Sequence, residues 1–279
     1  MKIIKKKSEL KELLYSFSNQ KIGFVPTMGA LHAGHISLIK ASKSRCDLTI
    51  CSIYVNPTQF SSQKDLRNYP TDAKKDIKLL KKHHCDILFI PNDFELYKNN
   101  LKSNEFDLNN FDKFMEGEYR PGHFQGVATV VTKLFKIVSP DIAFFGEKDL
   151  QQLIIIKYIS KELDLKIVSV PTVREKNGIA LSSRNINLTK DSFKSATIIF
   201  ESLCYCRDHI NKYDIVTLKN KVKKLFESSK LNLEYLEFVS MKTMHPVDVI
   251  CDNLAICIAA TIENIRLIDN IIINAEETN

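Results

Sequence analysis

Two histidines stand three residues apart in a segment of small and apolar residues. His32 and His35 lie in PTMGALHAGHISL, after an apolar run at residues 22–25 and before apolar residues at helical spacing that begin with Ile36. A strand, a glycine-bearing turn and a helix start in this order favour phosphate binding, because the first helical turn offers unpaired N–H groups and a partial positive charge. The two rings add donors on nearly the same side of that turn. Taken alone, the segment equally fits a strand-to-helix turn with two solvated histidines.

Two pairs of polar side chains follow apolar, β-rich runs elsewhere in the chain. Asn56 and Gln59 come after residues 47–55, and their amides can bind a carboxylate or hydroxyls without adding charge. Lys148 and Asp149 come after a run that ends in glycine. A lysine there suits a phosphate, and an aspartate suits ribose hydroxyls or a helix N-cap. Asn56 equally fits a turn that caps its own backbone, and Asp149 equally fits simple capping.

A hydroxyl-rich loop follows the last predicted parallel strand. Ser182, Ser183 and Arg184 place two hydroxyls and a guanidinium in sequence, which forms an anion clamp that can close over a polyphosphate leaving group. A serine there also fits the N-cap of the next helix. Because ligands of parallel sheets bind beyond the carboxyl ends of the strands, we expect four clusters to converge at one edge, residues 26–35, 56–60, 146–152 and 172–184.

The chemistry that these clusters predict is positioning and charge neutralisation around phosphates. The sequence shows no nucleophile elbow, no cysteine beside a convincing base and no pair of carboxylates expected to be buried. Charge-assisted contacts contribute about 1.5–3 kcal/mol each, and several acting together can support nucleotidyl transfer without a covalent enzyme intermediate.

The elements that must position the clusters alternate along the first two thirds of the chain. Apolar runs predict strands at residues 22–26, 47–55, 86–91, 142–146 and 166–171. Helical spacing predicts helices at residues 7–19, 35–45, 72–83, 125–138 and 149–162, with loop and short helix at 92–112. Strands separated by helices and joined by short loops predict a Rossmann-like α/β fold, a parallel sheet with helices on both faces.

The pattern changes after about residue 173. Helices are predicted at residues 190–210 and 214–228, followed by β-rich runs at 233–240, 254–262 and 265–273. Strands without long intervening helices predict a small antiparallel α+β domain. We therefore expect a nucleotide- and acid-binding domain at residues 1–173 and a smaller lid domain at 174–279 that carries the SSR loop.

Composition narrows the class of protein. The chain has 279 residues, 44% of them hydrophobic, and no run of 18 apolar residues, so no membrane span is expected. The basic N-terminus lacks the apolar segment of a secretory signal, which predicts a cytoplasmic protein. The seven cysteines are scattered and form no CxxC pair, which predicts reduced cysteines and no zinc site. The net charge is +7, but the lysines are spread along helix faces, which argues against nucleic-acid binding.

The segment HAGH at residues 32–35 resembles the HxGH signature of the nucleotidyltransferase superfamily, and the wider set resembles the pantoate–β-alanine ligase family. The matching segments lie in the family's order along nearly the whole chain: SIYVNPTQF, RPGHFQGVATVVTKLF, FGEKDLQQL, GIALSSRN and RLIDN. Departures from the family pattern occur at Ala33, Thr71, Leu150, Asn177 and residues 262–265, the last of which replaces a glycine- and threonine-containing turn.

The resemblance implies a two-step reaction. The carboxylate of pantoate attacks the α-phosphorus of Mg–ATP and releases pyrophosphate, and the amine of β-alanine then attacks the pantoyl adenylate. It implies that His32 and His35 bind the phosphates, the latter as proton donor, with Lys148, Ser182, Ser183 and Arg184 as further catalytic residues. The implied ATP site comprises Met28, Gly29, Ala30, Leu31, His32, Ala33, Gly34, His35, Gly146, Glu147, Lys148, Asp149, Val173, Leu181, Ser182, Ser183 and Arg184.

Further residues and partners follow from the same resemblance. Gln59 and Gln152 are expected to hold pantoate, with Asn56, Tyr69 and His123 as additional pantoate or β-alanine contacts and Asp76 as a magnesium ligand. A homodimer is expected, with no nucleic acid or membrane partner. Two alternatives remain at this point: another small nucleotidyltransferase that adenylates a phosphate ester, and a nucleic-acid-binding module that uses the basic surface.

Overall fold

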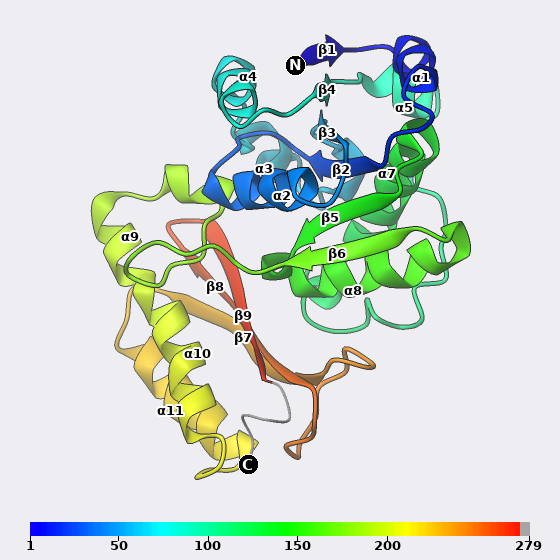
Figure 1. Ribbon diagram of the computed structural model, residues 1–279. Helices are drawn as coiled ribbons and strands as arrows, with labels where there is room; N and C mark the ends of the chain where they lie inside the picture. The colour runs from blue at the N-terminus through cyan, green and yellow to red at the C-terminus, as the bar shows by residue number, and fades with distance from the viewer. Residues whose placement is uncertain (274–279) are drawn as a thin grey trace. The chain divides into compact units, whose positions relative to one another are not determined.

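The first half of the fold is built on a parallel six-stranded sheet. The structure, a computed structural model, describes residues 1–273, and its sheet has the strand order β1-β4-β3-β2-β5-β6 (Figure 1). All five pairings are parallel, so every strand ends at the same edge. The strands are β1 (Lys2–Ile4), β2 (Ile22–Thr27), β3 (Leu48–Ile53), β4 (Ile87–Phe89), β5 (Ile142–Gly146) and β6 (Lys166–Val170).

Helices and short 3-10 turns connect these strands. The helices before residue 172 are α1 (Lys7–Tyr15), α2 (Ala33–Lys43), α3 (Gln63–Asn68), α4 (Ala73–Lys82), α5 (Asp93–Tyr97), α6 (Glu116–Tyr119), α7 (His123–Val138) and α8 (Leu150–Ile159). The 3-10 turns are η1 (Pro57–Gln59), η2 (Glu147–Asp149) and η3 (Ser160–Leu163).

Both faces of the sheet are covered, as the sequence predicted. Consecutive residues of a strand point to opposite faces, and both Phe24 and Val25 are fully buried. Phe24 makes an edge-on ring contact with Phe135 of α7, whereas Val25 packs in a core cluster with Ile36 and other residues of α2. Helices α7 and α2 therefore lie on opposite faces of β2.

Aspartates fix the amino ends of the strands. The carboxylates of Asp47, Asp86 and Asp141 accept backbone N–H bonds from Lys21, Thr49 and Ile22 at 2.9, 2.8 and 2.6 Å. Each aspartate immediately precedes a strand and reaches the start of its neighbour. These bonds set the register at the end of the sheet opposite to the predicted site.

The second sheet is antiparallel and has the order β7-β8-β9. Its strands are β7 (Asn232–Ser240), β8 (Leu254–Ile262) and β9 (Ile265–Ile273), and α10 (Thr197–His209) and α11 (Ile215–Glu227) pack on it, after η4 (Ser183–Asn187) and α9 (Lys190–Ser195). A tight two-residue turn joins β8 to β9, with φ of 50° at Glu263 and 65° at Asn264. The unusual residues 262–265 thus form a regular hairpin.

The chain divides into two compact units. Unit 1 contains residues 1–109, 120–147 and 152–171, and unit 2 contains residues 110–119, 148–151 and 172–279. Two short segments from the first two thirds of the sequence thus belong with the C-terminal residues. Each unit is described below by itself, and the functional domains at 1–173 and 174–279 stay a prediction.

Sequence patterns located most elements and missed a few. The strands predicted at residues 142–146, 254–262 and 265–273 have the observed bounds. The helix predicted at residues 7–19 ends at Tyr15, because a turn follows in which the Ser16 N–H donates to the Leu13 carbonyl. Strand β1 was not predicted, because three residues beside a lysine run are too few to show alternation.

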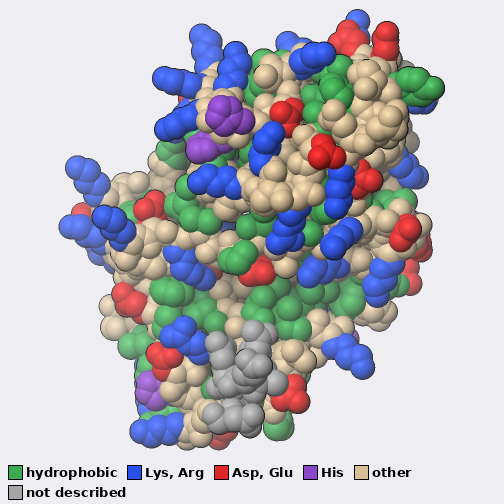
Figure 2. All heavy atoms as spheres, in the orientation of Figure 1, with side chains coloured by type: hydrophobic (Ala, Val, Ile, Leu, Met, Phe, Trp, Pro, Cys, Tyr) green, Lys and Arg blue, Asp and Glu red, His purple; other side chains and the backbone are tan. Residues whose placement is uncertain are grey.

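The surface and helix lengths agree with the composition. Figure 2 shows Lys and Arg side chains spread over the visible face and interspersed with acidic ones. The lysines of α4, at positions 74, 75, 78, 81 and 82, are all exposed. Among residues 1–273, no helix is long and apolar enough to cross a membrane.

We predict that Asp86→Ala lowers the free energy of unfolding by about 1–3 kcal/mol, because the Thr49 N–H then loses its acceptor in a partly buried position. Urea titration measures the change. Asp252→Ala, in an exposed loop, is the control and should change the value by less than about 0.5 kcal/mol. Equal stability of both variants would contradict a register-fixing role for Asp86.

Candidate active site

The segment between β2 and α2 is a turn that the side chain of Thr27 fixes. Thr27 donates its hydroxyl to the Ser52 carbonyl at 2.7 Å and accepts the Gly29 N–H at 3.2 Å. Gly29 has a φ of 81°, and a Cβ there would crowd both a carboxylate oxygen of Asp76 and the Ile53 side chain. Only glycine combines this conformation with this close approach.

His32 and His35 cap the N-terminus of α2. The Nδ1 atom of His32 accepts the Gly34 N–H at 3.1 Å, and the Nδ1 atom of His35 accepts the His32 N–H at 3.3 Å. The ring centroids are 4.2 Å apart. Since a neutral imidazole with Nδ1 as acceptor carries its proton on Nε2, the two rings present N–H donors on the side away from the backbone. The donors that the sequence predicts at this helix start are therefore the Nε2–H groups of the two rings.

Asp76, on helix α4, anchors the turn between β2 and α2. Its two carboxylate oxygens accept the N–H groups of Ala30 and Leu31 at 2.9 and 2.8 Å. The side chain is 2% exposed, and burial raises the pKa of Asp76 while the two backbone bonds oppose that rise. Leu31, 4% exposed, fixes the turn further by packing in the core.

The geometry of Asp76 shows that its carboxylate anchors the turn at residues 30–31. Both of its oxygens are used by backbone amides. Within residues 1–273, no group of three or more His, Cys, Asp or Glu side chains could hold a metal ion. A magnesium ligand at Asp76 stays a prediction.

A buried amide network positions Gln59 on η1. Asn56 has no exposed surface, donates to the Gln59 Oε1 at 3.0 Å and accepts the Tyr97 hydroxyl at 2.7 Å. It also donates to the carbonyl of Gly126 at 3.1 Å, where any Cβ would collide with the backbone of η1. These bonds fix the orientation of the Gln59 amide, and the predicted substrate contact of Asn56 stays a prediction.

The amide nitrogen of Gln59 points toward a weak acceptor. It donates to the thioether sulfur of Met28 at 3.1 Å, in the turn after β2. A thioether accepts hydrogen bonds poorly, so a carboxylate or hydroxyl would be a better partner for this donor. The structure thus brings the predicted residues Met28 and Gln59 together at the ends of the neighbouring strands β2 and β3.

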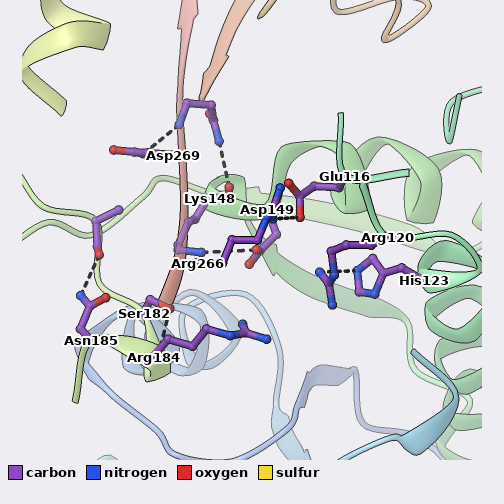
Figure 3. Close-up of polar contacts among 12 residues, drawn as sticks. Glu116, Arg120, His123, Lys148, Asp149, Ser182, Arg184, Asn185, Arg266 and Asp269 are labelled. Carbon is purple, nitrogen blue, oxygen red and sulfur yellow. Dashed lines mark hydrogen bonds and ion pairs between the residues drawn. The ribbon is translucent and has the colours of Figure 1, made fainter. Parts of the chain in front are cut away.

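His123 orients the same turn from the start of α7. Its Nδ1 lies 2.7 Å from the Gln59 carbonyl, and because a carbonyl only accepts, Nδ1 carries the proton. The Nε2 atom is then an acceptor, and the Arg120 Nη1 lies 3.2 Å from it; Figure 3 shows the two side chains side by side. Arg120 was not predicted, although it lies in the quoted segment RPGHF.

Two further predicted residues of unit 1, Tyr69 and Gln152, are partly exposed. Tyr69 follows α3 and makes an edge-on ring contact with Phe60, the residue after η1. Gln152 lies on α8 and is partly exposed. Ala33 and Gly34 form the first turn of α2, and Gly146 and Glu147 follow at the end of β5.

In unit 2, Lys148 and Ser182 of the loop at residues 181–184 line one pocket. The pocket is also lined by Ala180, Asn185, Phe200 and Asp269. The Lys148 ammonium lies 3.4 Å from the Asp149 carboxylate and is largely buried, with 17% of its side chain exposed (Figure 3). A buried cation beside hydroxyl groups is suited to an anionic ligand.

The loop at residues 181–184 starts from a short hairpin. The Leu181 N–H donates to the Val173 carbonyl at 2.9 Å, so these two predicted residues are paired. Ser182 caps η4 by accepting the Arg184 N–H at 3.3 Å. Ser182 therefore caps the 3-10 turn η4, whereas Thr189 caps the helix in the 190s, α9. The alternative that this serine is the N-cap of that helix is wrong.

We predict that Asp76→Ala increases amide hydrogen exchange at Ala30 and Leu31 by about ten- to a hundredfold, because both N–H groups lose their acceptor. Exchange measured by NMR tests this. Asp72→Ala is the matched control, since Asp72 only caps α4 through the Lys75 N–H. Unchanged exchange at residues 30 and 31 in Asp76→Ala would refute the anchoring role.

Comparisons with known proteins agree along the whole chain. A family model described as pantoate-beta-alanine ligase matches residues 2–272. A pantothenate synthetase of Thermosipho africanus is 42% identical, with 98% of this chain and 100% of that protein covered. One of Azobacteroides pseudotrichonymphae is 45% identical, with 97% and 99% covered.

Solved structures give the same result. Pantothenate synthetase from Thermus thermophilus superposes with a TM-score of 0.91 at 34% identity, covering 97% of this chain and 99% of that one. Pantoate-beta-alanine ligase from Francisella tularensis, complexed with beta-gamma ATP and beta-alanine, has a TM-score of 0.83 at 38% identity, covering 98% and 97%. Family model, relatives and structures coincide over almost every residue, and the chain therefore belongs to the pantoate–β-alanine ligase family.

Proposed function

We propose that this ligase condenses pantoate with β-alanine at the expense of ATP, through a pantoyl adenylate, and releases AMP and pyrophosphate. The observation that carries the proposal is the meeting of two donor sets at the ends of β2 and β3. His32 and His35, which cap α2, can donate to phosphate oxygens. The amide of Gln59, which donates to the Met28 thioether, can donate to the carboxylate of the acid instead.

In the first step a pantoate carboxylate oxygen attacks the α-phosphorus of ATP. A P–O bond forms, the bond between the α- and β-phosphoryl groups breaks, and pyrophosphate leaves with the electron pair. The Nε2–H groups of His32 and His35 can donate to the phosphate oxygens as negative charge moves toward the leaving group. Lys148, Ser182, Ser183 and Arg184 supply two cations and two hydroxyls that we also assign to ATP.

In the second step the neutral amine of β-alanine attacks the acyl carbon of the adenylate. A C–N bond forms, the C–O bond to the phosphate breaks, AMP leaves and the amine loses a proton. Gln59 and Gln152, assigned to pantoate, keep the acyl group in place between the steps. Holding both reactants in this way can contribute about 7–11 kcal/mol to the lowering of the barrier.

Magnesium is proposed to enter as part of the Mg–ATP substrate. The described carboxylates offer no three-ligand cluster, and Asp76 is occupied by backbone amides. Phosphate oxygens and water are then the main ligands, as is common for magnesium at nucleotides. We further propose that the protein is a cytoplasmic homodimer, which light scattering in solution tests.

We predict ATP–pyrophosphate exchange that requires pantoate and does not require β-alanine. The adenylate forms reversibly from ATP and the acid alone, so labelled pyrophosphate should appear in ATP before the amine is added. Exchange with a phosphate ester, and none with pantoate, would favour the alternative nucleotidyltransferase. Salt-sensitive binding of RNA or DNA without ATP would favour the nucleic-acid-binding module.

We predict that His35→Asn lowers the exchange rate by about 10²–10³-fold, because its Oδ1 can replace Nδ1 in the cap while the Nε2–H donor is lost. His35→Gln, which can place a donor near Nε2, should retain more activity than His35→Asn. Initial rates at saturating ATP and pantoate give the comparison. His84→Ala, at an exposed position after α4, serves as control, and equal activity of all three variants would remove His35 from the mechanism.

A further inference from the structure

A charged residue interrupts the apolar row of strand β9. Ile265, Leu267, Ile271 and Ile273 belong to or pack against the hydrophobic cluster under α10 and α11. Because side chains alternate along a strand, Asp269 occupies the middle of that row and Asn270 points to the other face of the sheet. Asp269 is 3% exposed and Asn270 is 6% exposed. Two adjacent buried polar groups of this kind require partners.

Asp269 finds its partner in Arg174. The guanidinium donates to both carboxylate oxygens, at 2.5 and 2.9 Å, and to the Asn270 carbonyl at 3.2 Å. Its planar group also lies over the Phe200 ring, 4.0 Å from the ring centroid. Burial raises the pKa of Asp269, and the bonds from Arg174 oppose that rise. Arg174 is thus fixed in direction by a bidentate pair and by stacking.

Arg174 belongs to the hairpin from which the 181–184 loop departs. It pairs with Ala180 across the hairpin and donates from Nη1 to the Gly178 carbonyl at 3.1 Å. The Glu175 N–H donates to the Ile179 carbonyl at 2.8 Å, which closes the ladder. The ion pair to Asp269 therefore fixes the base of the loop on β9.

Asn270 holds the second anion-binding element of unit 2. Its Nδ2 donates to the Lys148 carbonyl at 2.9 Å, and its own N–H donates to the Asp269 carboxylate at 2.8 Å. The Lys148 ammonium also interacts electrostatically with Asp269. Two consecutive residues of one strand thus hold the backbone of Lys148 and the hairpin of the 181–184 loop.

We propose that Asp269 and Asn270, with Arg174, are positioning residues that hold Lys148 and the Ser182–Arg184 loop in register for the phosphates of ATP. This inference rests on the proposed function, since ATP is the ligand of that function. An apolar residue in the row of β9 would satisfy the core at least as well as a buried ion pair. The ion pair instead fixes the orientation of the Arg174 guanidinium, which apolar packing alone does not do.

The experiment measures KM for ATP, KM for pantoate and kcat of pyrophosphate exchange in Asn270→Ala, Asp269→Asn and Arg174→Gln. We expect kcat/KM for ATP to fall about tenfold or more in each, and KM for pantoate to change by less than about twofold. Asp269→Asn combined with Arg174→Gln should lose less than the product of the single losses, because the two side chains act as one pair.

Glu237→Gln is the matched control, because it breaks an ion pair from α11 to β7 in the same unit without contact to either element. Because this pair is partly exposed, its loss should lower the melting temperature less than the test variants do, and kcat/KM for ATP should stay within about twofold of wild type. Test variants with wild-type kinetics, or with equal losses for ATP and pantoate, would overturn the inference. Wild-type protein without pantoate-dependent exchange would instead overturn the proposed function.

Discussion

The carboxylate of Asp76 is the constraint on which the turn between β2 and α2 depends. It is buried, and the backbone N–H groups of Ala30 and Leu31 are its hydrogen-bond donors. The contact stabilises both sides, because a buried carboxylate and the buried Leu31 amide each carry a desolvation penalty when unpaired. The turn that leads to His32 is therefore held by α4, a helix that follows the next strand of the sheet.

The groups around Gln59 are ordered by tautomer and amide orientation, and not by charge. The carbonyl of Gln59 requires a proton on Nδ1 of His123, and the cap of α2 requires protons on Nε2 of His32 and His35. Asn56 fixes the orientation of the Gln59 amide, so that its nitrogen faces Met28. A neutral, preoriented set of donors can hold a carboxylate without forming a tight ion pair, and a carboxylate held in that way keeps its nucleophilic character.

Sequence patterns sufficed for the layers of the fold, and they placed the segments that we propose for the site at the ends of strands. Strand-end clusters could be located because parallel strands end at one edge, and that rule needs only the order of elements. The role of Asp76 was missed, since its partners lie 45 and 46 residues away and no local pattern links them. The bonds of Asn56 to Gln59, Gly126 and Tyr97 could not be predicted either, because Gly126 and Tyr97 are far from it in the sequence. Its predicted substrate contact stays a prediction.

The same comparison indicates which sequence signals deserve more weight. An aspartate inside the run IRLIDNIII cannot be buried alone, so the run itself predicts a basic partner distant in the chain. Arg174 meets that requirement from the hairpin of the 181–184 loop, and no apolar contact could fix the guanidinium in one plane as the bidentate pair does. A charged residue in an apolar row is therefore informative about geometry elsewhere. In this chain it identifies the strand that holds the hairpin at the base of the 181–184 loop.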